Sequence, residues 1–82
     1  MKIELFSTLI NLTDLIDAGG QITIGAIDRF DCVAVANDEH NSLAMLRRKP
    51  GESIDELLIR LNRAVDQAWN DDLFIDEIND PN

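Results

Sequence analysis

The chain has little of what disulfide-stabilised, membrane-spanning or secreted proteins usually carry. It contains one cysteine among its 82 residues, so no internal disulfide can form and a reducing compartment is expected. No segment approaches the ~20 apolar residues that a membrane-spanning helix requires. The first residues include the acid Glu4 and lack the layout of a signal peptide. Together these features predict a cytoplasmic protein without a membrane partner.

Basic residues are also scarce. Seven lysines and arginines stand against sixteen acids, which gives a formal net charge of −9. Nucleic acids and anionic lipids bind proteins through cationic patches that displace counterions. The charge therefore argues against direct binding of nucleic acid or lipid. It favours either simple solubility or a basic protein partner.

Histidine and cysteine, which carry much of enzyme chemistry, occur once each, and the two residues are separated in the sequence. His40 is the only histidine and lies in a polar loop. Cys32 lies in an apolar alternating run without an adjacent cation, which is typical of a small buried residue. One cysteine and one histidine cannot form a closed zinc site, and the C-terminal acids do not follow the spacing of a calcium loop. We therefore expect no enzyme activity, no cofactor and no dedicated metal site.

The clearest structural signal is an amphipathic helix that follows Pro50-Gly51. Ser53 and Glu56 have the spacing of a capping box, in which each side chain accepts a hydrogen bond from the backbone N–H of the other residue. Glu56 also adds negative charge at the positive end of the helix dipole. The apolar residues of the segment recur on one helical face; they are Ile54, Leu57, Leu58, Leu61, Val65 and Ala68.

The rest of the chain supplies a surface for that apolar face. Leucines recur at helical spacing in residues 1–18, and Gly19-Gly20 ends this helix. The two-residue connection Asp28-Arg29 implies an antiparallel hairpin. Strands are predicted over residues 21–27, 30–36 and 42–48.

The predicted fold is therefore α+β in one small acidic domain over residues 1–82. A three-stranded antiparallel meander lies between an N-terminal helix and the capped amphipathic helix, in the order α-β-β-β-α, and both helices pack on it. A further short helix is expected to dock Leu73, Phe74 and Ile78 onto the core. Residues 79–82 are expected to fray.

This element order resembles that of the double-stranded-RNA-binding domain. Such domains carry a lysine cluster at the start of the second helix, where it grips phosphates. Residues 52–56 instead hold three acids at that place, and only residues 47–49 just before it are basic. RNA binding is therefore not expected, and the basic run is predicted to pair locally with acids.

Acidic and aromatic residues gather along the capped helix and the segment that follows it. Aromatic side chains anchor protein interfaces while charge steers the approach. Carboxylates three or four residues apart on a helix have Cβ atoms about 5–6 Å apart, a spacing that imitates part of a phosphate row. The predicted partner-binding residues are Asp55, Ile59, Asp66, Trp69, Asp71, Asp72, Phe74, Asp76 and Glu77.

Two functions follow from these residues. The first is a non-enzymatic acidic interaction module, in its sharpest form a nucleic-acid mimic that inhibits a basic DNA- or RNA-binding protein. In size, acidity and cysteine content the chain resembles phage-encoded inhibitors of bacterial defence, the anti-CRISPR proteins among them. The second is a small accessory subunit or homodimer that associates through Ile59, Trp69 and Phe74, with its acidity serving only solubility.

Overall fold

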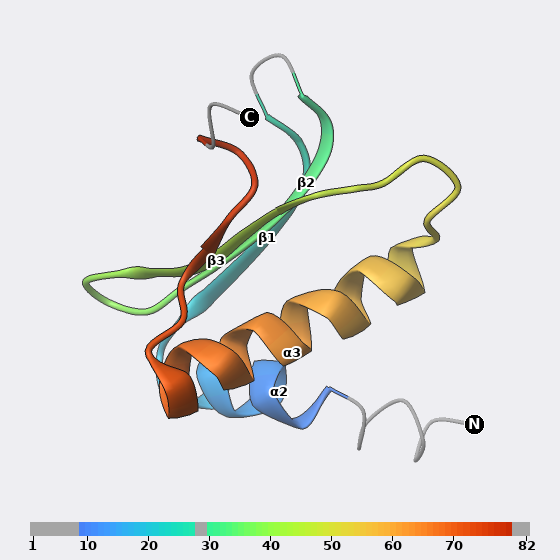
Figure 1. Cartoon of the computed structure of the whole chain (residues 1–82). Helices are drawn as coiled ribbons and strands as arrows, with labels where there is room; N and C mark the ends of the chain where they lie inside the picture. Colours follow the sequence, from blue (N-terminus) through green and yellow to red (C-terminus); the bar gives the residue numbers. More distant parts are fainter. Residues whose placement is uncertain (1–8, 28–29, 80–82) are drawn as a thin grey trace.

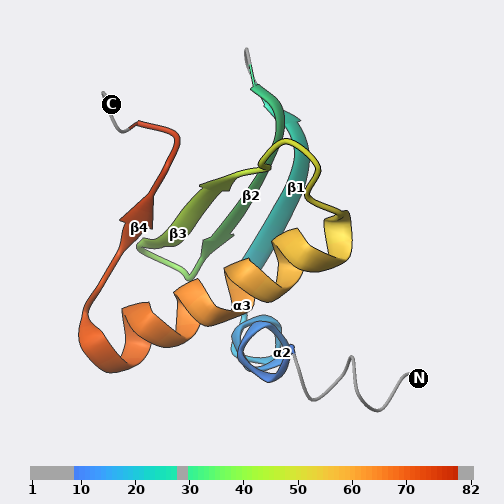
Figure 2. The ribbon, with the colours of Figure 1, turned by 45° about the vertical axis from the view of Figure 1, so that its right-hand side comes forward.

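The described part of the chain forms two helices and a four-stranded mixed sheet (Figure 1). The computed structural model describes residues 9–27 and 30–79. Both helices lie on the same face of the sheet, and α2 packs against α3 and β1 (Figure 2). In chain order the elements are α2 (Ile10–Asp17), β1 (Gln21–Ile27), β2 (Phe30–Asn37), β3 (Ser42–Arg47), α3 (Ile54–Asp71) and β4 (Ile75–Asp76).

The first three strands form the predicted antiparallel meander. Ile24 of β1 lies opposite Ala34 of β2, and Ala34 lies opposite Leu46 of β3. The α+β class and the α-β-β-β-α order are confirmed for the described residues. The connection Asp28-Arg29 and residues 1–8 of the predicted first helix lie outside them, so only Ile10–Asp17 of that helix is confirmed.

The prediction of a purely antiparallel three-stranded sheet is wrong, because β4 pairs parallel to the outer edge of β3. Ile75 lies opposite Ala44, and the N–H of Glu77 donates to the carbonyl of Met45 at 2.7 Å. An open strand edge exposes backbone groups that need partners, and the C-terminal segment supplies them. The predicted short helix that docks Leu73 and Phe74 is therefore absent, and both side chains are about half exposed.

The capping box that begins α3 is confirmed. Ser53 Oγ accepts the N–H of Glu56 at 3.0 Å, and Glu56 Oε1 accepts the N–H of Ser53 at 2.8 Å. The apolar face of α3 packs on the central strands, where alanines such as Ala34 and Ala44 let the helix approach closely. The buried apolar residues of α3 are Leu57, Leu61, Ala64, Val65 and Ala68.

A buried asparagine of α3 caps the start of α2. Leu9, at the N-terminal end of α2, provides no side-chain cap. The N–H of Leu12 instead donates to Asn62 Oδ1 at 3.0 Å, and Asn11 Nδ2 donates to the Asn62 carbonyl at 3.4 Å. Asn62 is only 6% exposed, so the bond is shielded from water. This contact fixes α2 against α3.

Replacing Asn62 with alanine is expected to lower the free energy of unfolding by about 1–3 kcal/mol, because the buried N–H of Leu12 would lose its acceptor. Chemical denaturation followed by circular dichroism measures the change. Asn70→Ala, on the exposed part of the same helix, is the control and should have a much smaller effect. Equal losses for the two variants would contradict this role of Asn62.

Candidate functional site

The predicted partner-binding residues occupy different parts of the structure. Asp55 is exposed in the first turn of α3, and Asp66 is exposed three turns later. Ile59 and the cationic Arg63 lie between them on the outward side of the helix, and Ile59 is only partly exposed. Because a base and a half-buried apolar residue interrupt it, this side of α3 carries no continuous row of carboxylates.

Five of the nine predicted residues lie in the last turns of α3 and in the segment that follows it, a region here named the C-terminal corner. Trp69 is 42% exposed, Leu73 50% and Phe74 53%. Within the described residues, the carboxylates of Asp66, Asp71 and Asp72 form no ion pair, and Asp66 accepts a hydrogen bond from Asn70 Nδ2. The C-terminal corner consists of Asp66, Trp69, Asp71, Asp72, Leu73 and Phe74.

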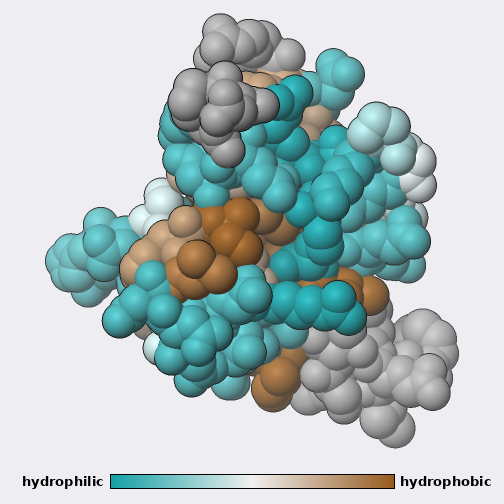
Figure 3. Space-filling view, viewed as in Figure 1, coloured by the Kyte–Doolittle hydropathy of each residue, from teal (hydrophilic) through white to brown (hydrophobic). Residues whose placement is uncertain are grey.

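The chain reverses direction at this corner. Asp72 has a left-handed backbone with φ of 54°, and the N–H of Leu73 returns to the carbonyl of Gln67 at 3.2 Å. The turn sends the chain back along β3 and leaves Leu73 outside the core. Sequence reasoning missed Leu73 as a surface residue, because its apolar character favoured burial. In Figure 3, hydrophobic surface gathers around β4 and is bordered by hydrophilic side chains.

The acids of the corner oppose local helix stability. The C-terminal end of a helix carries a partial negative charge, which favours bases and disfavours acids. The last turn of α3 contains no base, while Asp71 is its final residue and Asp72 follows directly. Helix formation therefore does not account for these carboxylates.

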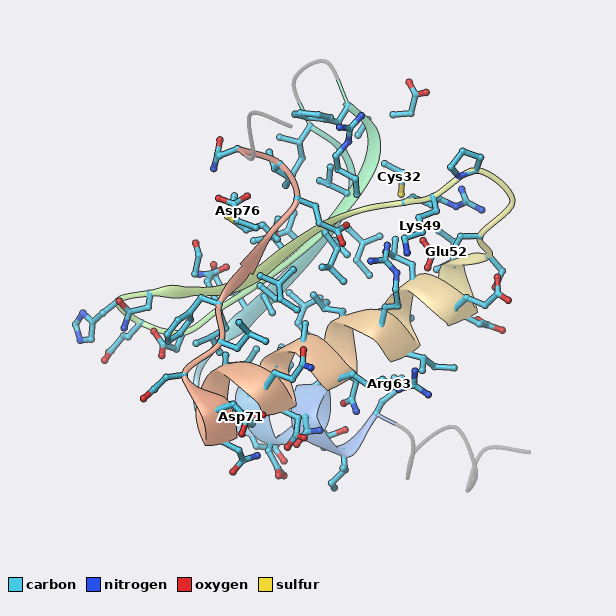
Figure 4. The ribbon with its side chains drawn as sticks, in the orientation of Figure 1. Cys32, Lys49, Glu52, Arg63, Asp71 and Asp76 are labelled. Carbon is cyan, nitrogen blue, oxygen red and sulfur yellow. The ribbon has the colours of Figure 1, made fainter. Side chains whose placement is uncertain are left out.

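Asp76 lies away from the corner. Side chains alternate along a strand, and Ile75 packs against the core, so Asp76 projects from the opposite face of the sheet. Figure 4 shows Asp71 at the end of α3 and Asp76 beside the sheet. The carboxylate of Asp76 accepts the N–H groups of Asn79 and Ile78 at 2.9 and 3.0 Å. These bonds lower the pKa of Asp76.

Glu77 is held within the fold by Arg60. Arg60 Nη1 lies 3.0 Å from Glu77 Oε2, and Arg60 Nε lies 2.7 Å from Glu52 Oε2. Arg60 Nη2 also donates to the carbonyl of Arg47 at 2.7 Å, and Glu77 Oε1 accepts the N–H of Arg47 at 2.9 Å. The Arg60 cluster, made of Arg60, Glu52 and Glu77, thus joins α3 to the end of β3 and to the segment after β4. Glu77 is the one predicted contact residue that pairs with an arginine in the described structure, and it shares that arginine with Glu52.

The Arg60 cluster perturbs the pKa values of its members. The hydrogen bond from Arg60 lowers the pKa of Glu52 to about 2, with a smaller contribution from the N–H of Lys49, which donates to Glu52 Oε1 at 2.9 Å. The same bond raises the pKa of Arg60. Only 9% of the Glu52 side chain is exposed, so solvent screens this pair weakly.

Acidification is expected to remove about 2 kcal/mol of stability that comes from Glu52. Its pKa is about 2 in the folded protein against an ordinary 4.5, so the contribution is complete above pH 4.5 and disappears as the pH falls toward 2. Urea denaturation of wild type and Glu52→Gln across this range measures it as the difference between the two profiles. If the free energies of unfolding of wild type and Glu52→Gln differ by the same amount at every pH below 4.5, the pairing of Glu52 with Arg60 is contradicted.

The basic run at residues 47–49 does not pair with acids as predicted. The guanidinium of Arg47 lies over the ring of Phe30, 4.7 Å from its centroid. Arg48 Nε donates to the backbone carbonyl of Glu52 at 2.6 Å. Among the residues that the structure describes, none of the three basic side chains forms an ion pair with a carboxylate.

His40 and Cys32 do not meet. His40 belongs to the connection between β2 and β3, where its side chain is 81% exposed and lies 3.4 Å from Glu39. Cys32 lies toward the other end of β2 and is partly exposed, so the prediction of a buried cysteine holds only in part. Within residues 9–27 and 30–79, no group of three or more acidic, histidine or cysteine side chains is placed to hold a metal ion. The described helices include none that is long and apolar enough to cross a membrane.

Comparison of the chain with protein-family models, curated proteins and solved structures finds no match. The C-terminal corner combines exposed apolar side chains with carboxylates that form no ion pair within the described residues. This combination makes the corner the candidate functional site.

Proposed function

We propose that the protein is a non-enzymatic interaction module whose C-terminal corner binds a basic surface of another protein. The observation that carries this proposal is that Trp69, Leu73 and Phe74 are all exposed, in the same short stretch of chain as three carboxylates that form no ion pair within the described residues. Large apolar side chains supply contact area in an interface, while complementary charge steers the encounter and selects the partner. The net charge of −9 extends the same attraction over distance.

The position of the acids also supports a role outside folding. Asp71 and Asp72 repel each other and the negative end of α3, so their charges cost some stability. A cationic partner would relieve both repulsions on binding. Acids that served only solubility would be equally effective at places where they favour the helix, such as its first turn.

The sharpest form of the proposal is mimicry of a nucleic acid. The mimicking row would be short, because Arg63 interrupts the acids on α3 and Asp76 projects from another face. Asp66, Asp71 and Asp72 would then take the places of phosphates in a cleft built for DNA or RNA. The basic partner would be a nucleic-acid-binding protein that the module inhibits.

The test begins with the immobilised protein and a cell lysate at low salt. The retained protein is identified, purified and titrated against the module over a range of salt concentrations. The proposal expects a basic partner whose affinity falls steeply as salt rises. Competition by DNA or RNA then tests mimicry: displacement supports it, and simultaneous binding contradicts it. An affinity that does not change with salt would contradict the whole proposal.

Trp69 and Phe74 also support the second function, a homodimer or accessory subunit. Ile59 does not adjoin them, because it lies ten residues before Trp69, about 15 Å along α3. A homodimer would therefore use Trp69 and Phe74 without Ile59. Light scattering separates the two functions: a dimer dissociated by Phe74→Asp would favour the second, and a monomer the first.

A further inference from the structure

A cleft with a volume of about 770 Å³ lies between β2, the end of β3 and the start of α3. The ring of Phe30, the thiol of Cys32 and Pro50 contribute apolar surface to it. Arg47, Arg48 and Lys49 contribute cationic side chains. In Figure 4, Cys32, Lys49 and Glu52 lie together at this end of the molecule, and Asp71 marks the far end of α3.

The cleft gathers positive charge in a protein that is otherwise acidic. Three of the five lysines and arginines among the described residues line it. The acids of its lining are Asp31 and Glu52, and Glu52 shares the charge of Arg60 with Glu77. With Arg60 and Glu77 included, four bases stand against three acids among the described residues here, so the local balance is slightly positive in spite of the overall charge. The walls of the cleft concentrate the field of these cations inside it.

The cationic groups are partly fixed in place and form no close ion pair within the described residues, although the charge of Lys49 attracts Glu52. Stacking on Phe30 holds the guanidinium of Arg47, and the Nε bond to the Glu52 carbonyl holds that of Arg48. Within the described chain, no carboxylate pairs with either group or with the ammonium of Lys49. Guanidinium groups present planar sets of N–H donors that fit phosphate oxygens, and lysine adds a point charge.

We propose that this cleft binds a small polyanion that carries phosphoryl groups. Two guanidinium groups and an ammonium together match a group with several negative charges better than a single carboxylate. The apolar wall of Phe30 and Pro50 accommodates an uncharged part of the ligand. The site is independent of the proposed function, because it lies at the start of α3 and the C-terminal corner lies at the end of that helix.

Cys32 provides a direct test, because it lines the cleft and is the only cysteine of the chain. The rate of its alkylation by iodoacetamide is measured by mass spectrometry on the full-length protein with increasing pyrophosphate. Ionic strength is held constant with sodium chloride. Pyrophosphate is expected to slow alkylation in a saturable manner. Inorganic phosphate is expected to act at higher concentration, and citrate, which carries charge without phosphoryl groups, to protect less.

Matched variants assign the effect to the cleft. The double variant Arg48→Gln with Lys49→Gln is expected to need about tenfold more pyrophosphate for the same fractional protection. Lys49→Gln alone, whose side chain makes no hydrogen bond in the described structure, covers the case in which the double variant does not fold. Arg63→Gln removes a cation outside this cleft and should behave as wild type.

Three results would overturn the proposal. The first is the absence of protection at pyrophosphate concentrations up to about 10 mM, which corresponds to negligible affinity. The second is equal protection by citrate, which would assign the effect to charge alone. The third is unchanged protection in the glutamine variants of residues 48 and 49.

Discussion

Replacing Arg60 with methionine is expected to lower the free energy of unfolding by about 3 kcal/mol. Methionine keeps most of the aliphatic stem and removes the guanidinium. Glu52 and Glu77 would both lose their cation, and the carbonyl of Arg47 would lose a donor. Because Glu52 is largely buried, its charge would remain in a poorly solvated place. Urea denaturation at neutral pH measures the loss.

The same substitution is expected to loosen the C-terminal strand before the rest of the fold. Glu77 holds the segment after β4 through Arg60 and through the N–H of Arg47. Hydrogen exchange of the Glu77 amide, which donates to Met45, should therefore accelerate more than that of amides in β2. Arg63→Met is the control, since the exposed Arg63 forms no ion pair with another described residue. Equal destabilisation by both variants would contradict the importance of the Arg60 cluster.

Reversing two charges at the C-terminal corner is expected to weaken partner binding at least about a hundredfold, because each new cation would face a basic surface. The variant is Asp66→Lys with Asp71→Lys, and calorimetric titration with the purified partner measures its affinity. The free energy of unfolding is expected to stay the same or to rise by about 0.5 kcal/mol, because bases suit the end of a helix. Binding and stability should thus change in opposite directions, which a merely structural role would not produce.

The control for this reversal changes the net charge by the same amount elsewhere. Asp14→Lys with Glu39→Lys alters two exposed acids, one on α2 and one in the connection between β2 and β3. This variant should weaken binding only slightly, through the long-range field. If both variants lose the same affinity, net charge alone attracts the partner. If neither loses affinity, the corner does not bind it.

Most residues of the candidate site could be named from the sequence. The sequence did not show that the fold places Asp76 and Glu77 away from the others. Trp69, Asp71 and Asp72 were assigned to one surface because they are close in the sequence near a helix end. All three are exposed there, but Trp69 and Asp71 are two residues apart on a helix and so do not face each other. Asp76 and Glu77 are neighbours in the sequence, yet strand alternation directs Asp76 to one face and an arginine 17 residues away engages Glu77. The cationic cleft was missed because its walls come from two strands and a loop.

Local patterns were sufficient to predict the helix–strand–strand–strand–helix order and the residue at which α3 begins. A capping box and a helical stripe each involve residues within a few positions of each other, so the sequence alone reveals them. Contacts between distant residues decided the parallel strand β4, the Asn62 cap and the Arg60 cluster. The Asn62 bond joins residues 50 positions apart, and β4 forms where β3 leaves an edge open. Such partners depend on which backbone groups and charges remain unsatisfied after the chain has packed, and that depends on the whole fold.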